Sequence, residues 1–116
     1  MSTVDNCLFC KISSGLIPAD LVAESESAIA FRDIDPKAPT HVLVIPRSHF
    51  ADVDDLTASD PNLAGELLAL AAEVARLEGL GAGYRIVTNT GEDGGQSVAH
   101  VHFHVLGGRS LSWPPG

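Results

Sequence analysis

The sequence predicts an α+β fold, with an antiparallel sheet of about five strands, one long helix and one short helix. Short β-capable runs occupy residues 21–23, 28–31 and 41–45, and one long stretch with helical periodicity follows at residues 61–78. Two further β-capable segments come after that helix. Strands grouped before and after a single helix are typical of an antiparallel sheet, because a parallel sheet requires strands and helices to alternate.

The N-terminal third of the chain supplies a short helix and a hairpin. Residues 12–18 are predicted as a short helix or turn that ends at Gly15. The runs 21–23 and 28–31 are separated by the polar cluster 24–27, Glu-Ser-Glu-Ser. Two β-capable runs on either side of a polar turn predict a β-hairpin.

A proline-containing loop and an apolar strand come next. Residues 33–39 contain two prolines and are predicted to form a loop. The run His41-Val-Leu-Val-Ile45 is almost entirely apolar, as expected for a central strand covered on both faces, and Pro46 ends it.

The long helix has recognisable start and stop signals. Asp60 is the predicted N-cap, Pro61 occupies the first helical position, and Gly79 ends the helix. An apolar stripe at helical spacing is predicted to face the core: Leu63, Leu67, Leu70, Ala71, Val74 and Leu77. Residues 84–88 then form a strand that leads into a glycine-rich loop.

The stretch 97–105, Ser-Val-Ala-His-Val-His-Phe-His-Val, holds three of the five histidines. Because side chains alternate along a strand, His100, His102 and His104 are predicted to share one face, and the apolar residues between them the other. Such a face suits either a metal site or acid–base and nucleophilic chemistry near neutral pH, and the strand alone leaves both open.

The loop that precedes this strand favours phosphate chemistry. Residues 89–97, Asn-Thr-Gly-Glu-Asp-Gly-Gly-Gln-Ser, form a tight glycine-rich segment whose backbone N–H groups can converge on an anion. A glycine loop alone is usually a turn. Together with a serine and three aligned histidines it indicates a phosphate site.

The length, composition and net charge of the chain indicate its domain organisation and the kinds of molecule that it binds. The 116 residues are expected to form a single domain, 1–116, with enough apolar content for a compact core. The net charge of −8 argues against nucleic-acid binding. We expect no membrane association and a cytoplasmic location, because no apolar run has spanning length and the N-terminus lacks a signal pattern.

Cys7 and Cys10 form a C-x-x-C pair near the N-terminus. In a cytoplasmic chain such a pair suggests a metal or redox site more than a structural disulfide. The pair supplies only half of a zinc site, so histidines must complete it. Simple packing of two small apolar side chains remains the alternative.

His100-Val-His102-Phe-His104-Val105 resembles the signature of the histidine triad (HIT) superfamily of nucleotide hydrolases and transferases. The segments 31–34, 38–46, 93–97 and 106–109 and the tail Trp113-Pro-Pro-Gly116 are similar to the Hint branch, the histidine triad nucleotide-binding proteins and purine nucleoside phosphoramidases. The resemblance spans nearly the whole chain and implies the HIT-like fold as a homodimer.

The resemblance also implies roles for individual residues. His102 is expected to be the nucleophile and His41 to orient the triad, while His104, Ser97 and Asn89 act on the phosphate or the leaving group. Asp33 can bind the two hydroxyls of a ribose. The expected nucleotide contacts are completed by Phe9, Ile12, Ile17, Phe31, Ile34, Gly95, Gln96, Val98 and Trp113.

Some HIT relatives complete a zinc site with the cysteine pair and two histidines. The matching positions here are Cys7, Cys10, His49 and His100. The resemblance therefore implies a structural zinc ion, whereas no cofactor is expected for catalysis.

The expected reaction is hydrolysis of the P–N or P–O bond of purine nucleoside 5′-monophosphate derivatives through a nucleotidyl-histidine. One alternative is a dinucleoside polyphosphate hydrolase of the same superfamily, which the Trp-Pro-Pro-Gly tail fits poorly. The other is a non-catalytic nucleotide-binding or zinc-stabilised interaction module. In the expected homodimer, each Trp113 reaches towards the partner's pocket.

Overall fold

The structure, a computed structural model, describes residues 4–116 and contains in that range a five-stranded antiparallel sheet and three helices. The strand order is β1-β2-β3-β5-β4. The strands are β1 (Leu21–Glu24), β2 (Ala28–Arg32), β3 (Thr40–Pro46), β4 (Tyr84–Val87) and β5 (Phe103–Gly107), and the helices are α1 (Leu8–Ser13), α2 (Val53–Ser59) and α3 (Pro61–Leu77). The predicted α+β class and the five strands are confirmed, with one helix more than expected.

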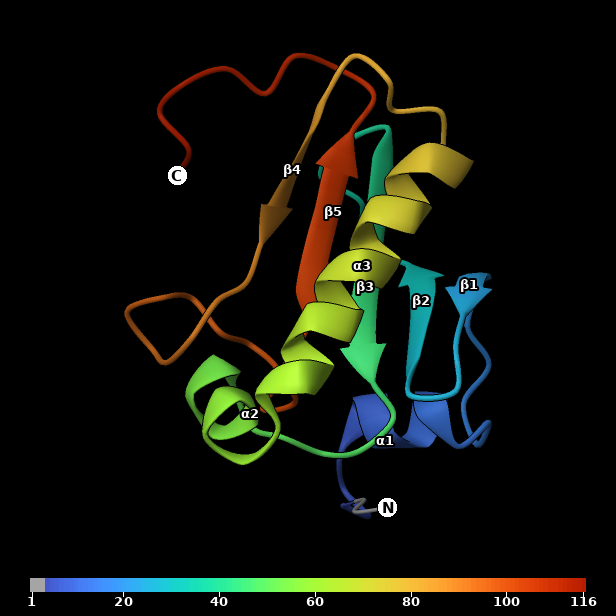
Figure 1. Ribbon diagram of the computed structural model, residues 1–116, viewed down its shortest axis with the longest axis vertical. Coiled ribbons are helices and arrows are strands. Elements are labelled where there is room, and N and C mark those ends of the chain that lie inside the picture. Colours follow the sequence, from blue (N-terminus) through green and yellow to red (C-terminus); the bar gives the residue numbers. More distant parts are fainter. Residues whose placement is uncertain (1–3) are drawn as a thin grey trace.

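Helix α3 lies across one face of the sheet (Figure 1). The predicted cap is confirmed, because an Asp60 carboxylate oxygen accepts a hydrogen bond from the backbone N–H of Leu63 at 3.2 Å and Pro61 is the first helical residue. Gly79 follows the helix with a φ of +71°, a conformation that glycine adopts without strain. The buried stripe matches the predicted one except at Leu77, which is exposed, with Ala75 buried in addition.

The central strand β3 is buried along its whole length, as predicted. Val42 and Val44 belong to the core beneath α3, whereas Leu43 and Ile45 belong to a second core on the opposite face. Strand β2 divides its residues in the same way, with its alanines towards α3. Small side chains on that face allow the helix to approach the sheet closely.

The two short helices differ from the sequence prediction. The short helix or turn predicted at residues 12–18 begins earlier in the structure, as helix α1 at residues 8–13, and the Cys7 thiol at its N-cap accepts from the backbone N–H of Cys10 at 3.4 Å. Thiols are weak acceptors, so this N-cap was not recognisable from the sequence. Helix α2 was not predicted, although Asp52 caps it and acidic residues fill its first turn.

The histidine segment is a regular strand only at its C-terminal end. Strand β5 begins at Phe103, and residues 97–102 reach it through bends. The predicted alternation of the apolar residues is nevertheless confirmed, because Val101, Phe103 and Val105 all lie in the core beneath α3. The bends are needed because His100 and His102 have different neighbours, described below.

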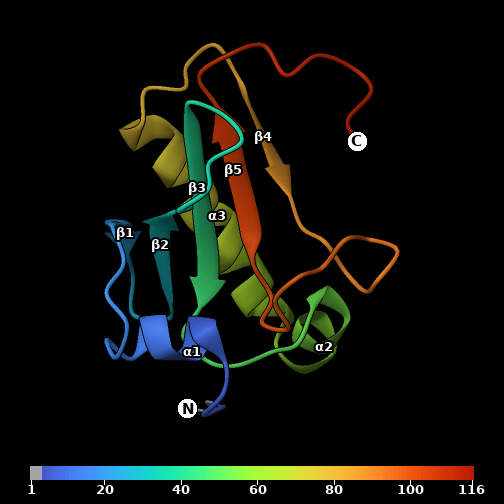
Figure 2. The ribbon, with the colours of Figure 1, turned by 180° about the vertical axis from the view of Figure 1, so that it is seen from behind.

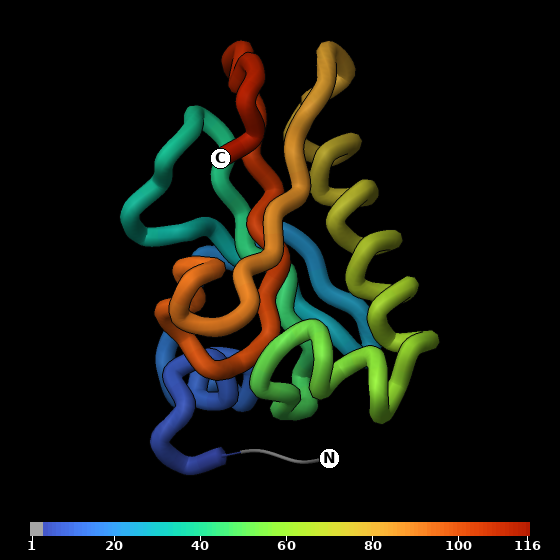
Figure 3. Tube along the Cα trace, turned by 90° about the vertical axis from the view of Figure 1, so that its left-hand side faces the viewer, coloured from blue at the N-terminus to red at the C-terminus, as the bar shows by residue number. Residues whose placement is uncertain are grey.

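Loops project from the face of the sheet opposite α3 (Figures 2 and 3). The segment between β2 and β3, residues 33–39, and the glycine-rich segment after β4 both lie on that side in Figure 3. Within residues 4–116, no helix has the length and apolar character needed to cross a membrane.

Candidate active site

A cavity of about 510 Å³ opens on the face of the sheet opposite α3, bounded by α1, the loop 33–39 and the start of β5. Its volume is within the range of small-molecule sites. Ten of its residues were predicted from the sequence: Phe9, Ile12, Ile17, Phe31, Asp33, Ile34, Ser97, Val98, His102 and His104. Six were not: Leu8, Pro18, Ala19, Asp20, Arg32 and Leu43. Nothing in the local sequence distinguishes those six from ordinary turn and strand residues.

A second cavity, of about 560 Å³, lies at the C-terminal end of α3 and is lined by Ala72, Ala75, Arg76, Gly79, Leu80, Gly81, Gly83 and Tyr84. Its walls are mainly small or apolar residues and contain no histidine. The histidine-lined cavity is therefore the candidate active site.

His102 is held in one tautomer by the backbone. Its Nδ1 lies 2.8 Å from the carbonyl oxygen of His100. Because a carbonyl can only accept, Nδ1 carries the proton of the neutral ring and Nε2 carries a lone pair. The Phe9 ring contacts the imidazole edge to face at 5.1 Å. The ring is thus oriented by two groups while it lines the cavity.

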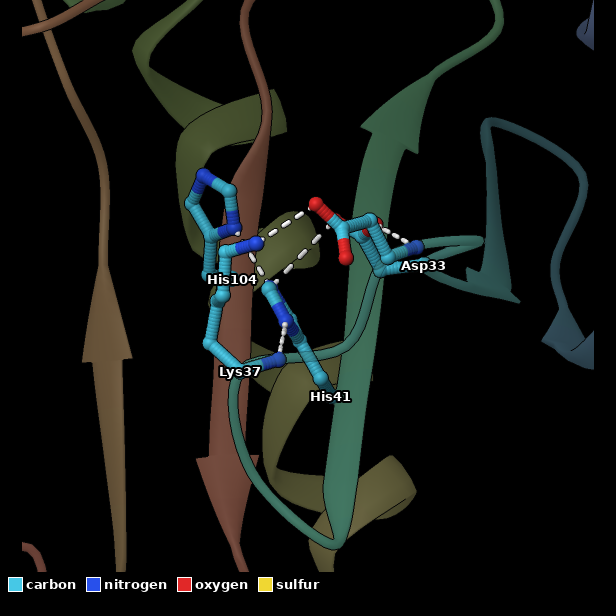
Figure 4. A network of polar contacts seen from close by, with 5 residues as sticks. Asp33, Lys37, His41 and His104 are labelled. Atoms are coloured by element: carbon cyan, nitrogen blue, oxygen red, sulfur yellow. Dashed lines mark hydrogen bonds and ion pairs between the residues drawn. The ribbon is translucent and has the colours of Figure 1, made fainter.

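His104 and His41 form a second ordered arrangement, which Figure 4 shows. The backbone N–H of Lys37 donates to His41 Nδ1 at 3.0 Å. The proton of the neutral His41 ring is therefore on Nε2, which lies 2.9 Å from His104 Nδ1 and 3.5 Å from an Asp33 carboxylate oxygen. Since His104 Nδ1 accepts a hydrogen bond from this N–H, the proton of the neutral His104 ring is on Nε2.

Burial keeps both of these rings neutral. It lowers the pKa of His104 to about 4, with smaller contributions from the charges of His102 and His41. Burial also lowers the pKa of His41, and the nearby Asp33 carboxylate opposes that shift. At neutral pH, the two imidazoles therefore act as hydrogen-bond donors without carrying charge.

The glycine-rich loop is folded by its own side chains. The Asn89 amide donates to the carbonyl of Gly94 at 2.7 Å, and the Gln96 side chain accepts from the N–H of Gly91 and donates to Ala51 and Val98 carbonyls. Asn89, Gly95 and Gln96 do not line the cavity, whereas the following Ser97 and Val98 do. The loop is too tightly folded at Gly94 for any other residue, since a Cβ there would lie 2.3 Å from the carbonyl oxygen of Thr90.

Trp113 lies on the C-terminal tail and is 81% exposed. It does not line the cavity of its own chain. The tail is attached to the edge strand β4, because the Arg85 guanidinium donates to the carbonyls of Ser112 and Pro115.

Cys7, Cys10, His49 and His100 come together at the end of the sheet near α1, with their ligand atoms within 4.8 Å of one another. His100 Nδ1 lies 3.3 Å from Cys7 Sγ and 3.5 Å from Cys10 Sγ, and His49 Nδ1 lies 3.3 Å from Cys10 Sγ. On its other side, His100 donates from Nε2 to the Pro46 carbonyl at 2.9 Å, so the lone pair of Nδ1 faces the thiols. Two sulfurs and two imidazoles form a donor set suited to zinc.

Burial shifts the pKa values in this cluster as well. It lowers the pKa of His100 to about 4, so the ring is neutral, as a metal ligand must be. The pKa of the Cys10 thiol is raised, chiefly by burial.

Three histidines at alternate positions, the last of them on strand β5 and two of them lining a cavity, are the arrangement that defines the histidine triad proteins. Residues 14–111 match the HIT domain. The chain belongs to this family.

Relatives and solved structures agree with this assignment. The chain is 50% identical over 112 residues to an uncharacterised HIT-like protein of Synechococcus elongatus, a match that covers 97% of this chain and 98% of the relative. It is 51% identical to a HIT family hydrolase of Legionella pneumophila, with a TM-score of 0.91 over 96% of this chain and all of the other. A histidine triad nucleotide-binding protein of Candida albicans is 30% identical, with a TM-score of 0.81 over 96% and 85% of the two chains.

Proposed function

We propose that this protein hydrolyses the P–N bond, or a P–O bond, of purine nucleoside 5′-monophosphate derivatives through a nucleotidyl-histidine intermediate. The observation that carries the proposal is the hydrogen bond from His102 Nδ1 to the His100 carbonyl. It leaves the lone pair of Nε2 available in a ring that lines the cavity. The likeness to a HIT family hydrolase supports the same class of reaction.

In the first step, the lone pair of His102 Nε2 forms a bond to phosphorus and the bond from phosphorus to the leaving nitrogen breaks. The leaving nitrogen keeps the electron pair and takes a proton from the Ser97 hydroxyl, which lies at the cavity wall. In the second step, the oxygen of a water molecule bonds to phosphorus and its proton returns to the Ser97 oxygen, while the bond from phosphorus to His102 Nε2 breaks and the ring departs with its lone pair, so both residues are regenerated.

His104 stabilises the negative charge that develops on the phosphoryl oxygens. Its Nε2–H is available because its Nδ1 accepts from His41. A donor already fixed in orientation is worth more to the transition state than one that must reorient. His41 therefore acts through His104 rather than on the substrate, which fits its absence from the cavity wall.

The nucleoside fits the remainder of the cavity. Apolar side chains of α1, β2 and the adjoining loop, including Phe9, Phe31 and Ile34, suit a base, and the Asp33 carboxylate suits the two ribose hydroxyls. The Asp33 side chain is 21% exposed, so it is reachable from the cavity.

We also propose that Cys7, Cys10, His49 and His100 bind a structural zinc ion. The proposal rests on the proximity of the four ligand atoms and on the orientation of His100 by the Pro46 carbonyl. All four positions are protein ligands, so the metal would stabilise the fold around α1 and take no part in the reaction.

A two-fold homodimer completes the proposal. Strand β4 is at the edge of the sheet, and Tyr84, Leu68 and Leu77 are large apolar or aromatic residues that remain exposed. An open strand edge favours pairing with a second copy. In that assembly Trp113 would reach the partner's cavity near the leaving group.

Steady-state turnover tests the function. Adenosine 5′-phosphoramidate, guanosine 5′-phosphoramidate and a diadenosine tetraphosphate would be compared with wild-type protein, with His102→Ala as the control. We expect the two phosphoramidates to be cleaved with the higher kcat/KM. Preference for the tetraphosphate would favour a dinucleoside polyphosphate hydrolase, and no turnover of any substrate with measurable nucleotide binding would favour a non-catalytic module.

A further inference from the structure

The backbone of Lys37 connects the active-site histidines to a residue outside the cavity. Its N–H donates to His41 Nδ1 at 3.0 Å. Its carbonyl oxygen accepts from Arg109 Nη2 at 3.1 Å. The N–H belongs to the peptide group between Pro36 and Lys37, and the carbonyl to the one between Lys37 and Ala38, so the two bonds hold the two planar groups that flank the Lys37 Cα.

The middle of the loop 33–39 has few other attachments. The Asp33 carboxylate accepts from the N–H of Asp35, and the Lys37 ammonium pairs with the Asp35 carboxylate, but both contacts are internal to the loop and exposed to solvent. Besides the contacts with His41, two contacts come from the residues that follow β5. Gly108 packs against Pro39, since a Cβ on Gly108 would lie 2.8 Å from Pro39 Cβ, and Arg109 holds the Lys37 carbonyl.

The segment 103–109 thus carries His104 on strand β5 and, in the two residues after the strand, two contacts that hold the loop. This arrangement couples loop position to ring orientation. A backbone N–H can only donate, so as long as Lys37 is in place, His41 Nδ1 must be an acceptor and its proton must be on Nε2. If the loop moves away, His41 can take the other tautomer, and the donor to His104 is lost.

We propose that Arg109 is a positioning residue that fixes the tautomers of His41 and His104 through the backbone of Lys37. The inference rests on the proposed function, because it assigns His104 Nε2–H to the phosphoryl oxygens. It concerns a side chain that does not touch the cavity and that makes only one bond to the loop.

The first measurement is the tautomeric state, read from the ¹⁵N chemical shifts of the imidazoles in full-length protein without nucleotide. In the wild type, we expect His41 and His104 to be protonated at Nε2 only. In Arg109→Ala, we expect intermediate shifts at His41, which indicate exchange between tautomers. Arg109→Lys keeps a donor of similar reach and should return the shifts towards the wild-type values.

The second measurement is kcat and KM with adenosine 5′-phosphoramidate. Loss of one exposed hydrogen bond predicts that kcat falls about three- to tenfold in Arg109→Ala while KM changes less than about twofold. The matched control is Arg47→Ala, which removes a guanidinium that donates to the Ser25 carbonyl at 3.0 Å in the β1–β2 turn, away from the cavity. This control should leave both kcat and the imidazole shifts unchanged.

Wild-type ¹⁵N shifts in Arg109→Ala would overturn the inference, as would a fall in kcat of the same size in both arginine variants. A lower melting temperature with unchanged shifts would also overturn it, because it would reduce Arg109 to a purely structural contact. If the wild type cleaves no phosphoramidate, the proposed function fails, and the shifts alone still decide whether Arg109 fixes the tautomers.

Discussion

Two clusters of potential metal ligands lie on either side of His102, and they differ in what surrounds their imidazoles. In the first, Cys7, Cys10, His49 and His100 are gathered around a point that thiols and ring nitrogens face. In the second, Asp33, His41 and His104 have ligand atoms equally close together. There, however, the ring nitrogens that meet are already joined by a hydrogen bond.

The direction of the hydrogen bond that orients each imidazole distinguishes the cluster suited to a metal from the cluster suited to a phosphoryl group. The proximity of the ligand atoms and the pKa of the imidazole do not distinguish them. Burial lowers the pKa of His100 and of His104 to about 4 in both cases. His100 is oriented by a carbonyl that leaves a lone pair facing the thiols, which suits a metal. His104 is oriented by a donor that leaves an N–H at the cavity, which suits a phosphoryl oxygen.

The largest expected effect is that of removing the proposed nucleophile, His102, which lies between the two clusters. His102→Ala should reduce phosphoramidate turnover by at least about 10⁴-fold, because the Nδ1 lone pair of His104, the other histidine at the cavity wall, is occupied by the hydrogen bond from His41. Nucleotide binding, measured by calorimetry, and zinc content should both persist. A covalent nucleoside monophosphate trapped from wild-type protein by rapid quench should map by mass spectrometry to His102, and a map to His104 would exchange the roles assigned above.

The second prediction separates stability from catalysis. Cys10→Ser should abolish stoichiometric zinc, measured by elemental analysis, and lower the melting temperature by about 5 °C or more. Wild-type protein purified without chelator should contain one zinc per chain. Zinc-free wild-type protein would contradict the metal assignment and leave the cluster as a packed set of thiols and rings.

The third prediction concerns the pH dependence of stability at His104. Its pKa is about 4 in the folded protein and near 6.5 in the unfolded chain, so the unfolded chain binds the proton more tightly. The stabilising contribution is complete above pH 6.5, decreases as the pH falls towards 4, and changes no further below that. After allowance for partial solvent exposure, the loss at pH 5 is about 1 kcal/mol. Urea unfolding at pH 7, 6 and 5 should show this loss in wild-type protein and less of it in His104→Gln.

The smallest expected effect concerns the tail. Truncation after Arg109 removes Trp113 together with the segment that Arg85 holds. We expect a dimer by light scattering and a change of a few-fold in the relative kcat/KM of phosphoramidates with small and bulky amines. An unchanged ratio would restrict Trp113 to packing, and a monomer at micromolar concentration would refute the dimer.

Sequence reasoning worked where a pattern has one physical meaning. The Asp60-Pro61 start, the helical stripe and the apolar run of β3 each indicate a single structure, and the structure confirms them. It also identified most of the cavity wall, because the histidine signature resembles a known family. The bounds of α1 and the existence of α2 were not predicted, because helices of six or seven residues are too short to show a clear helical periodicity.

The parts that could not be predicted depend on long-range contacts. Nothing near Arg109 in the sequence indicates that its side chain meets the carbonyl of Lys37, 72 residues earlier. The resemblance implies that Asn89 acts on the phosphate and that Gln96 contacts the nucleotide, but it does not indicate the hydrogen bonds by which their amides hold the loop to Gly94, Gly91 and Ala51. The bends at residues 97–102 likewise arise from the separate neighbours of His100 and His102.

The acceptor of the Lys37 amide has a consequence for hydrogen exchange. The residue is exposed and lies in a loop, where amide hydrogens ordinarily exchange quickly with solvent. This one is protected by an imidazole nitrogen, and it remains protected only while His41 is unprotonated at Nδ1. Acid-induced deprotection of a single loop amide, ahead of its neighbours, would therefore report the protonation of a buried ring from a position at the surface.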